Sequence, residues 1–353
     1  MRKIKRYIAN VVFWSILVVL SVIVALDVIS SIVDQLGSIS GDYNFVEVLI
    51  FTALKLPATI YEYLPMAALI GCLVGLGILA NSNELVVIRS AGVSVSQIIW
   101  AVMRPTIIVI IVGTLLGEYV SPYTSQYGDS RRALALGNQQ ALQSERGVWN
   151  REGSEYMHFN AVMSQGKLFG ITRYRFDNNG KMTEASFVES AIYQGDYWFE
   201  QNGVVTLFND GKIERKTFAT RYWETDISPG LLNVLVLPPE NLPINRLHTQ
   251  AKYLAKQGLD SSEYRLAYWN KVLQPLTIAS LVMIAVSFIL GPLRQTTMGF
   301  RVFVGVIVGL IFQTSQKILG PTSIIFGFSP LFAVLIPVAV CFLFGLTFLY
   351  RAR

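Results

Sequence analysis

Histidine and cysteine are scarce in this chain of 353 residues, which contains two of each. They are His158, His248, Cys72 and Cys341. The histidines lack the spacing of metal ligands, and the cysteines fall in separate apolar runs, where inert packing side chains are expected. The sequence also lacks the phosphate-binding pattern GxxxxGK(S/T) and the hydrolase patterns HExxH and GxSxG. We therefore expect no catalytic residue, no metal site and no cofactor.

Charged residues are also few, at 15% of the chain, whereas 52% of the residues are hydrophobic and the mean hydropathy is +0.46. This balance is too apolar for a soluble enzyme. The net charge of +6 lies outside the segment 121–261, which carries 15 basic and 15 acidic residues. Basic residues on the cytoplasmic side of a membrane explain this charge more simply than nucleic-acid binding does.

Six apolar runs are close to the length of about 20 helical residues that a bilayer requires. They cover residues 9–32, 63–81, 97–119, 271–291, 301–319 and 326–350. The basic start Met1–Arg6 resembles a signal peptide, but the run after it is too long and lacks a small-residue cleavage site, so we expect an uncleaved span. Pro57 and Pro65 interrupt the approach to the second run, which favours a separate periplasmic or interfacial helix over 45–63.

Alternation of these spans places ten basic residues and one acid, Glu84, on the same side of the membrane. The ten are Arg2, Lys3, Lys5, Arg6, Arg89, Arg104, Arg294, Arg301, Arg351 and Arg353. Apart from the segment 121–261, the opposite side carries four basic residues and seven acids. The positive-inside rule therefore predicts that both chain ends are cytoplasmic and that the segment 121–261 lies outside the inner membrane.

Three spans carry a GxxxG pair, which lets helix backbones approach closely in lipid. The pairs are Gly71 with Gly75, Gly113 with Gly117, and Gly305 with Gly309. Because the motif is common in apolar helices, packing within one bundle is favoured over a dedicated dimer interface.

Short alternating runs dominate residues 147–226, which is typical of an antiparallel β domain with a sandwich or roll architecture. Hairpin signals are Asp177–Gly180 between the runs 168–176 and 182–193, and Asn209–Gly211 between the runs 204–208 and 213–223. Gln201–Gly203 gives a third turn signal, and residues 248–260 are typical of a helix that leads into the fourth span.

The stretch 81–97 joins the second and third spans and is too long for a simple turn. Its N-cap candidates are Asn81, Ser82 and Asn83, and its apolar face consists of Leu85, Val86 and Ile88. Glu84 falls in the first turn, where a negative charge suits the helix dipole, and Gly92 can end the helix. The pattern predicts a short amphipathic helix on the inner membrane face. An ordinary interfacial helix that seals the bundle is the alternative interpretation.

In and before this stretch the sequence reads Leu76-Gly77-Ile78-Leu79-Ala80 and then Ser82-x-Glu84-Leu85-x-x-x-Arg89-x-x-Gly92-x-Ser94. These residues resemble the LptF/LptG permease family of the lipopolysaccharide exporter. Gly291-Pro292-Leu293-Arg294 and Gly320-Pro321 resemble later motifs of the same family. The resemblance covers nearly the whole chain and is closer to the LptG members than to the LptF members.

The resemblance implies one permease half of an ABC exporter in the bacterial inner membrane, with a periplasmic jelly roll and no nucleotide site of its own. Spans would lie in domains 1–120 and 262–353, with the β domain and a connecting helix in 121–261. The partners would be an LptF-type permease, an LptB-type ATPase dimer, and the jelly-roll proteins LptC and LptA, and lipopolysaccharide would be the cargo. The ATPase would push on the helix in 81–97, with Glu84, Leu85, Ile88, Arg89 and Gly92 as coupling residues.

Four basic residues near the outer ends of spans are candidates for contact with the phosphates of the lipid head group. They are Arg131, Arg132, Lys55 and Lys317. The resemblance supports this role for Arg132, whereas snorkelling of the side chains to the interface is the alternative for all four. Some relatives carry a lysine where this chain has Ser31, so a head-group contact at that position is not expected here.

Three other functions are compatible with parts of the pattern. A permease of the same mechanical type could serve another lipid or a lipoprotein. A membrane-anchored periplasmic sensor would normally have an inner signalling module, and a lipid-modifying enzyme would need convergent polar residues within its spans. This sequence offers neither feature.

Overall fold

The structure is a computed structural model that describes residues 2–39, 43–136, 148–163, 166–177, 180–209, 212–225, 227, 239–256, 260–291 and 296–351. The chain forms two compact units. The first comprises Met1–Ser30, Leu56–Pro122 and Pro243–Arg353, and the second comprises Ser31–Lys55 and Tyr123–Leu242.

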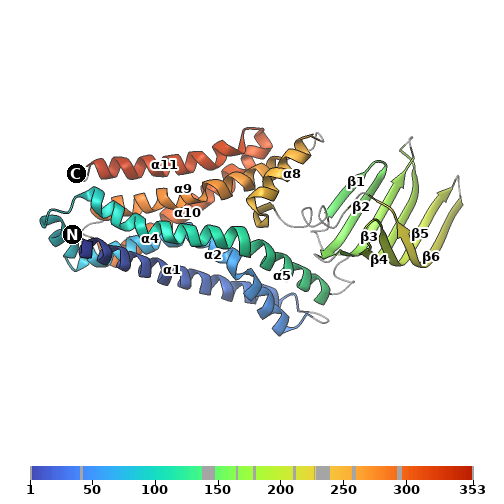
Figure 1. Ribbon diagram of the computed structural model, residues 1–353, viewed down its shortest axis with the longest axis horizontal. Coiled ribbons are helices and arrows are strands. Elements are labelled where there is room, and N and C mark those ends of the chain that lie inside the picture. Colours follow the sequence, from blue (N-terminus) through green and yellow to red (C-terminus); the bar gives the residue numbers. More distant parts are fainter. Residues whose placement is uncertain are drawn as a thin grey trace. The chain divides into compact units, whose positions relative to one another are not determined.

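Among the described residues, six helices are long and apolar enough to cross a membrane (Figure 1). They are α1 (Arg2–Leu36), α2 (Phe45–Asn81), the continuous run of α4 (Val95–Leu115), η1 (Leu116–Val120) and α5 (Ser121–Ala135), α9 (Ser262–Leu290), α10 (Met298–Phe326) and α11 (Pro330–Arg351). The shorter helices are α3 (Glu84–Ser90), η2 (Pro239–Asn241) and α8 (Ile244–Lys256). The predicted number and order of spans are confirmed. The start of α1, the helix α3 and the end of α11 lie at the same end of the helical unit (Figure 1).

The predicted separate helix over residues 45–63 is wrong, because α2 continues through both Pro57 and Pro65. A proline has no N–H, so Pro65 leaves the carbonyl of Tyr61 without its donor from the next turn. The side chain of Gln274 on α9 replaces that donor, with its Nε2 2.9 Å from the Tyr61 oxygen. A neighbouring helix thus satisfies the freed backbone group, and α2 need not break.

The predicted helix over 248–260 begins earlier, at Ile244, and its described part ends at Lys256. The Glu118 carboxylate accepts a hydrogen bond from the Ile244 N–H, with its oxygens at 2.9 and 3.0 Å. A carboxylate at this position satisfies an unpaired donor and suits the positive end of the helix. Residues 257–259 of the prediction lie outside the described residues.

Each glycine of these pairs lies either on α2 or against a side chain of α2. A Cβ on Gly71 would lie 2.5 Å from the Ile16 Cα of α1, and one on Gly113 would lie 2.2 Å from Leu64 on α2. A Cβ on Gly305 of α10 would lie 2.6 Å from Leu73 on α2. The prediction that these motifs pack within one bundle is therefore confirmed for these contacts.

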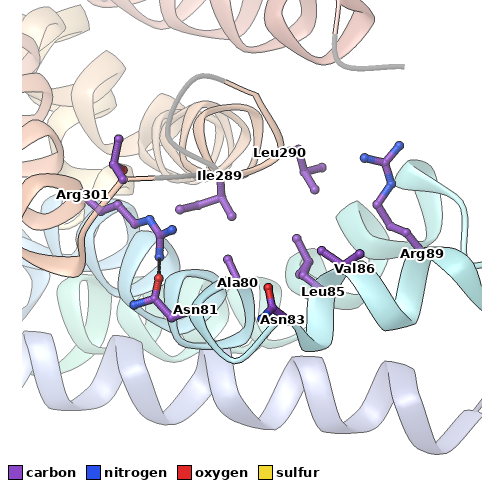
Figure 2. Close-up of a pocket in the computed structure, with 10 residues that line it drawn as sticks. Ala80, Asn81, Asn83, Leu85, Val86, Arg89, Ile289, Leu290 and Arg301 are labelled. Atoms are coloured by element: carbon purple, nitrogen blue, oxygen red, sulfur yellow. Dashed lines mark hydrogen bonds between the residues drawn. The ribbon is translucent and has the colours of Figure 1, made fainter.

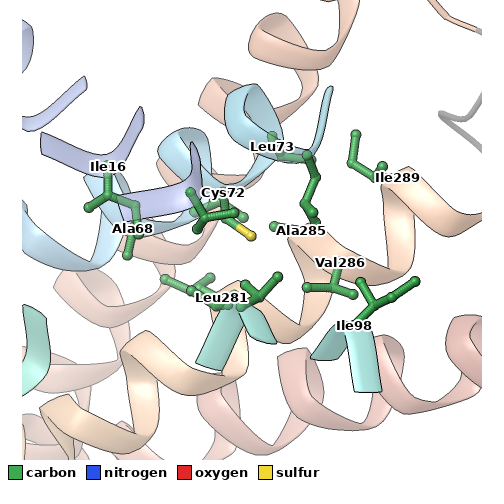
Figure 3. Packing of buried hydrophobic residues seen from close by; sticks show 14 of the residues in the cluster. Ile16, Ala68, Cys72, Leu73, Ile98, Leu281, Ala285, Val286 and Ile289 are labelled. Atoms are coloured by element: carbon green, nitrogen blue, oxygen red, sulfur yellow. The ribbon is translucent and has the colours of Figure 1, made fainter. Parts of the chain in front are cut away.

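The core of the helical unit is a single apolar cluster around α2 and α9 (Figure 3). Its members include Ile16, Ala68, Cys72, Leu73, Ile98, Leu281, Ala285, Val286 and Ile289. Cys72 is fully buried there, as expected for a packing side chain.

The inserted β domain contains one antiparallel sheet whose strands follow one another in the order β1 to β6 (Figure 1). The strands are β1 (Val148–Glu152), β2 (Glu155–Met163), β3 (Lys167–Phe176), β4 (Met182–Tyr193), β5 (Trp198–Asn209) and β6 (Lys212–Trp223). The pairing of β3 with β4 and of β5 with β6 confirms the two predicted hairpins. One face of the sheet buries the cluster of Met157, Phe159, Ile171, Val188, Trp198 and Trp223.

The third predicted turn, Gln201–Gly203, is wrong because these residues lie inside β5. Asn202 adopts a left-handed backbone with φ 53° while remaining in the strand, and its amide donates to Glu189 on β4 at 3.0 Å. A Cβ at Gly203 would lie 2.1 Å from the Phe218 ring of β6, so only glycine leaves room for that ring. The Phe218 ring of the neighbouring strand therefore explains why glycine follows Asn202 here, although an Asn-Gly pair usually indicates a turn.

Candidate functional site

Helix α3 has well-defined ends that its own sequence dictates. It begins at Glu84 after Asn83, whose carbonyl accepts the N–H groups of Val86 and Val87 at 3.1 and 3.2 Å. It ends in a Schellman motif, in which Gly92 has φ 85° and the Val93 N–H bonds the Ile88 carbonyl at 3.3 Å. The predicted start and stop are thus confirmed, although Asn83 makes no side-chain capping bond.

The two faces of α3 differ from the predicted apolar face. Leu85 and Ile88 are buried in the core of the helical unit, whereas Val86 is exposed. Val87 is 64% exposed. The exposed surface of α3 is therefore formed by Val86 and Val87, with Glu84 and Arg89 near its two ends. Leu85 and Ile88 therefore anchor α3 to its own bundle.

Glu84 has a neighbour that the sequence did not reveal. Its carboxylate lies near the hydroxyl of Tyr7, close to the start of α1. The first turn of α3 thus faces the start of α1. Glu84 is half-buried, and Arg89 lies near the other end of the helix.

A polar cavity of about 380 Å³ adjoins α3 (Figure 2). Arg301 of α10 lines one side and Arg89 of α3 lines the other, with Asn81 and Asn83 between them. Thr296 also belongs to the lining. The lining thus combines two guanidinium groups with neutral polar side chains, next to the surface of α3.

Arg301 is a residue that sequence reasoning missed, because it was counted only as a charge on the inner face. Its side chain is 1% exposed, and its Nη1 donates to the Gly77 carbonyl at 2.8 Å and to the Asn81 Oδ1 at 2.9 Å. A Cβ at Gly77 would lie 3.1 Å from this nitrogen, so glycine permits the approach. Arg301 thereby ties α10 to the carboxyl end of α2, where a cation suits the helix dipole.

The outer candidates fall into two groups. Lys55 pairs with Asp129 at 2.8 Å, and Arg131 forms a two-pronged ion pair with Glu47 at 2.7 and 2.8 Å. Both ion pairs link α2 to α5, so each of these cations already has a carboxylate partner within the chain.

Arg132 and Lys317 differ from that first pair of cations. Arg132 lies over the rings of Tyr43 and Phe51 at 6.0 and 5.4 Å, and its buried Nε has no hydrogen-bond partner. Lys317 is exposed on α10, and no other described residue bonds its ammonium group. These two cations are therefore better placed than Lys55 and Arg131 to meet an external anion.

Lys271, one of the four basic residues that the sequence assigned to the outer side, is buried in the helical unit. In the π-helical turn η1 the Ser121 N–H donates to the Leu116 carbonyl, five residues earlier. With the same spacing the Gly117 carbonyl would accept from the N–H of Pro122, but proline has no N–H. The Lys271 ammonium supplies the donor, 3.2 Å from the Gly117 oxygen. Burial of Lys271 is thus explained by a backbone acceptor that proline left free.

The described residues define a multi-pass membrane protein in which a β domain is inserted between the third and fourth spans and a short helix is held at the turn between the second and third. Over residues 6–351 the chain matches the family described as lipopolysaccharide export system permease LptF/LptG. It therefore belongs to that family.

Two curated relatives illustrate how closely this chain follows the family. It is 33% identical to lipopolysaccharide export system permease protein LptG of Escherichia coli strain K12 over 350 residues, which cover 98% of this chain and 97% of the relative. It is also 33% identical to the protein of the same name from Haemophilus influenzae over 336 residues, 94% of each chain. The similarity includes both the helical unit and the β domain.

Proposed function

We propose that this chain is the LptG-type permease subunit of an exporter that extracts lipopolysaccharide from the inner membrane. The observation that supports this function is the 33% sequence identity to LptG proteins over nearly the whole length of the chain. An LptF-type permease would complete the membrane cavity, an LptB-type ATPase dimer would drive it, and LptC and LptA would receive the lipid. The same mechanics could serve another lipid or a lipoprotein, which is the alternative.

The geometry of α3 suits a mechanical connection to the ATPase. Leu85 and Ile88 attach the buried side of α3 to the core of the helical unit. A force on the exposed side of α3 would therefore move the bundle together with the helix. The bond from Arg301 to Gly77 and Asn81 connects the adjoining end of α2 to α10. Force on α3 thus has a packed route into several spans.

Reconstitution tests this function directly. The chain is co-expressed with the partner permease and ATPase, and the purified assembly is placed in liposomes that contain lipopolysaccharide. We expect ATP-dependent release of lipopolysaccharide to a soluble LptA-type acceptor. Release of an added lipoprotein or phospholipid, with none of lipopolysaccharide, would instead support the alternative cargo.

The proposed orientation has the chain ends and α3 in the cytoplasm and the β domain in the periplasm. Single cysteines at Ser96 and Thr217 report it, because both positions are exposed. After replacement of Cys72 and Cys341, a membrane-impermeant thiol reagent is expected to label only the Thr217 position in intact cells with permeabilised outer membranes. Labelling of both positions from the same side would contradict the six-span topology.

Arg132 is expected to contribute more to head-group binding than Arg131. Arg132→Gln is expected to lower crosslinking of lipopolysaccharide about tenfold, because a charge-assisted bond to phosphate is worth roughly 1.5–3 kcal/mol. Arg131→Gln instead breaks the pair with Glu47 and is expected to affect mainly the thermal stability of the assembly. Photocrosslinking yield and melting temperature, measured on both variants, separate the two effects. Equal crosslinking by Arg132→Gln and the unsubstituted protein would contradict head-group binding and support snorkelling of Arg132 to the membrane interface.

A further inference from the structure

An aromatic pocket of about 540 Å³ lies on strands β1 to β3, near the β1–β2 and β3–β4 turns. Its lining includes Trp149, Arg151, Ser154, Tyr156, Tyr174 and Phe176. In the sheet register, Arg151 pairs with Tyr156 and Tyr156 pairs with Tyr174, so these side chains share one face. The alternating residues Met157 and Phe159 of β2 belong to the buried cluster, so the pocket is on the opposite face of the sheet.

The rings of the aromatic pocket lie next to one another in pairs, and Trp149 is largely open to solvent. Trp149 is 60% exposed, and its ring is nearly parallel to that of Tyr174, with an interplanar angle of 16° and a centroid distance of 6.3 Å. Tyr156 and Phe176 meet edge to face at 5.5 Å. An exposed set of large aromatic side chains on a sheet is costly and typically marks a binding surface.

Polar groups around these rings are free to bond a ligand. No other described residue bonds the Trp149 indole N–H or the hydroxyls of Ser154, Tyr156 and Tyr174. Arg151 lies over the Tyr156 ring at 5.0 Å and uses its Nε for the Gly153 carbonyl at 3.1 Å, which leaves its terminal nitrogens available. An acyl chain would leave these donors unsatisfied, whereas a hydroxyl-rich ring would bond them.

The aromatic pocket contains one cation, Arg151, and one carboxylate, Asp177. Asp177, which also lines it, accepts the Lys181 N–H at 2.8 Å and so directs one oxygen into its own turn. His158 packs against Trp149 with ring centroids 4.9 Å apart, and burial lowers its pKa, so it is neutral at neutral pH. Arg151 is therefore the cation available to a ligand.

We propose that the aromatic pocket binds a sugar ring of the lipopolysaccharide cargo, with the ring stacked on Trp149 and an anionic substituent on Arg151. The faces of aromatic rings are electron-rich and attract the polarised C–H groups of a sugar, while the surrounding donors meet its hydroxyls. This inference rests on the proposed function for the identity of the cargo. It adds a sugar-binding site to the β domain, on the face of the sheet opposite the buried cluster that contains Met157 and Phe159.

The test uses the purified assembly in phosphatidylcholine nanodiscs, because a maltoside detergent would itself offer a sugar to the pocket. The probe is fully deacylated lipopolysaccharide, titrated by calorimetry with its phosphates present or removed. Trp149→Ala is expected to weaken binding of both probes about tenfold, which corresponds to roughly 1.4 kcal/mol. Trp149→Phe, which keeps a ring, is expected to weaken it less. Arg151→Gln is expected to weaken only the phosphorylated probe.

Two exposed residues of β6 give matched controls, Tyr222→Ala and Arg215→Gln, and neither is expected to alter binding. Equal affinity of Trp149→Ala and the unsubstituted assembly would overturn the inference, as would the absence of any binding of the deacylated probes. If lipopolysaccharide is still exported in those cases, the proposed function stands and only the sugar site is wrong. Loss of a co-purifying protein in Trp149→Ala, with unchanged sugar binding, would identify the face as a protein contact and also overturn the inference.

Discussion

Replacing Glu84 with alanine is expected to leave the ATPase bound while it lowers ATP-driven export about tenfold. An ion pair at the rim of an interface contributes only about 0–1 kcal/mol, so assembly survives its loss. Coupling between two sites is typically worth about 1–3 kcal/mol, which sets the size of the expected defect. Because Leu85 and Ile88 face the bundle, we expect Glu84 to supply a directional contact to the ATPase that the exposed valines of α3 cannot.

Export and ATP hydrolysis measured on the same proteoliposomes distinguish this uncoupling from loss of assembly. Glu84→Gln keeps the size and the carbonyl oxygen of the side chain but removes the charge, so it is expected to behave like the alanine variant. Tyr7→Phe removes only the hydroxyl and is expected to have a smaller effect. Normal export by Glu84→Gln would show that the charge has no coupling role and that α3 simply seals the bundle.

Replacing Glu200 with alanine is expected to destabilise the β domain by about 3–5 kcal/mol, the usual result of removing one partner from a buried ion pair. Glu200 is 0% exposed, and its carboxylate lies 2.6 Å from Arg173 and 2.8 Å from Arg221. Arg221 can turn toward solvent, but Arg173 is buried under the Trp223 ring at 4.6 Å. Glu155, at 3.3 Å, would be its nearest remaining carboxylate.

Hydrogen–deuterium exchange in β3 to β5 of the full chain measures this loss. Removing both charges, in Arg173→Leu with Glu200→Leu, is expected to cost much less than Glu200→Ala, because no buried charge is left uncompensated. Glu214→Ala is the matched control: its pair with Lys216 is exposed, so a change within about 0.5 kcal/mol is expected. Exchange in Glu200→Ala as slow as in the unsubstituted chain would contradict the prediction.

Local sequence determined the spans, the inserted β domain and the ends of α3. Long apolar runs specify helices because a membrane leaves no water for free backbone groups. The turn after Phe176 and the stop at Gly92 depend on residues within one or two positions. These features could be predicted because each is decided by interactions among neighbours in the chain.

Neighbouring elements decided the points where those local rules failed. Pro65 does not end α2, because Gln274 from α9 bonds the freed carbonyl. Asn202 and Gly203 do not form a turn, because Glu189 bonds the first and the Phe218 ring lies against the second. In each case a side chain from a segment distant in sequence bonds or packs against the residues at which the local pattern predicted an interruption of the helix or strand.

Tertiary structure likewise decided which charges are available for function. The sequence treated Arg131 and Arg132 alike, yet Glu47 engages Arg131, while Arg132 keeps a nitrogen without a partner. It counted Arg301 as one inner-face charge among ten, whereas the fold buries it against Gly77. A charged side chain takes its role from the acceptors that the packed helices bring within about 3 Å of it, and those acceptors come from segments far away in the sequence.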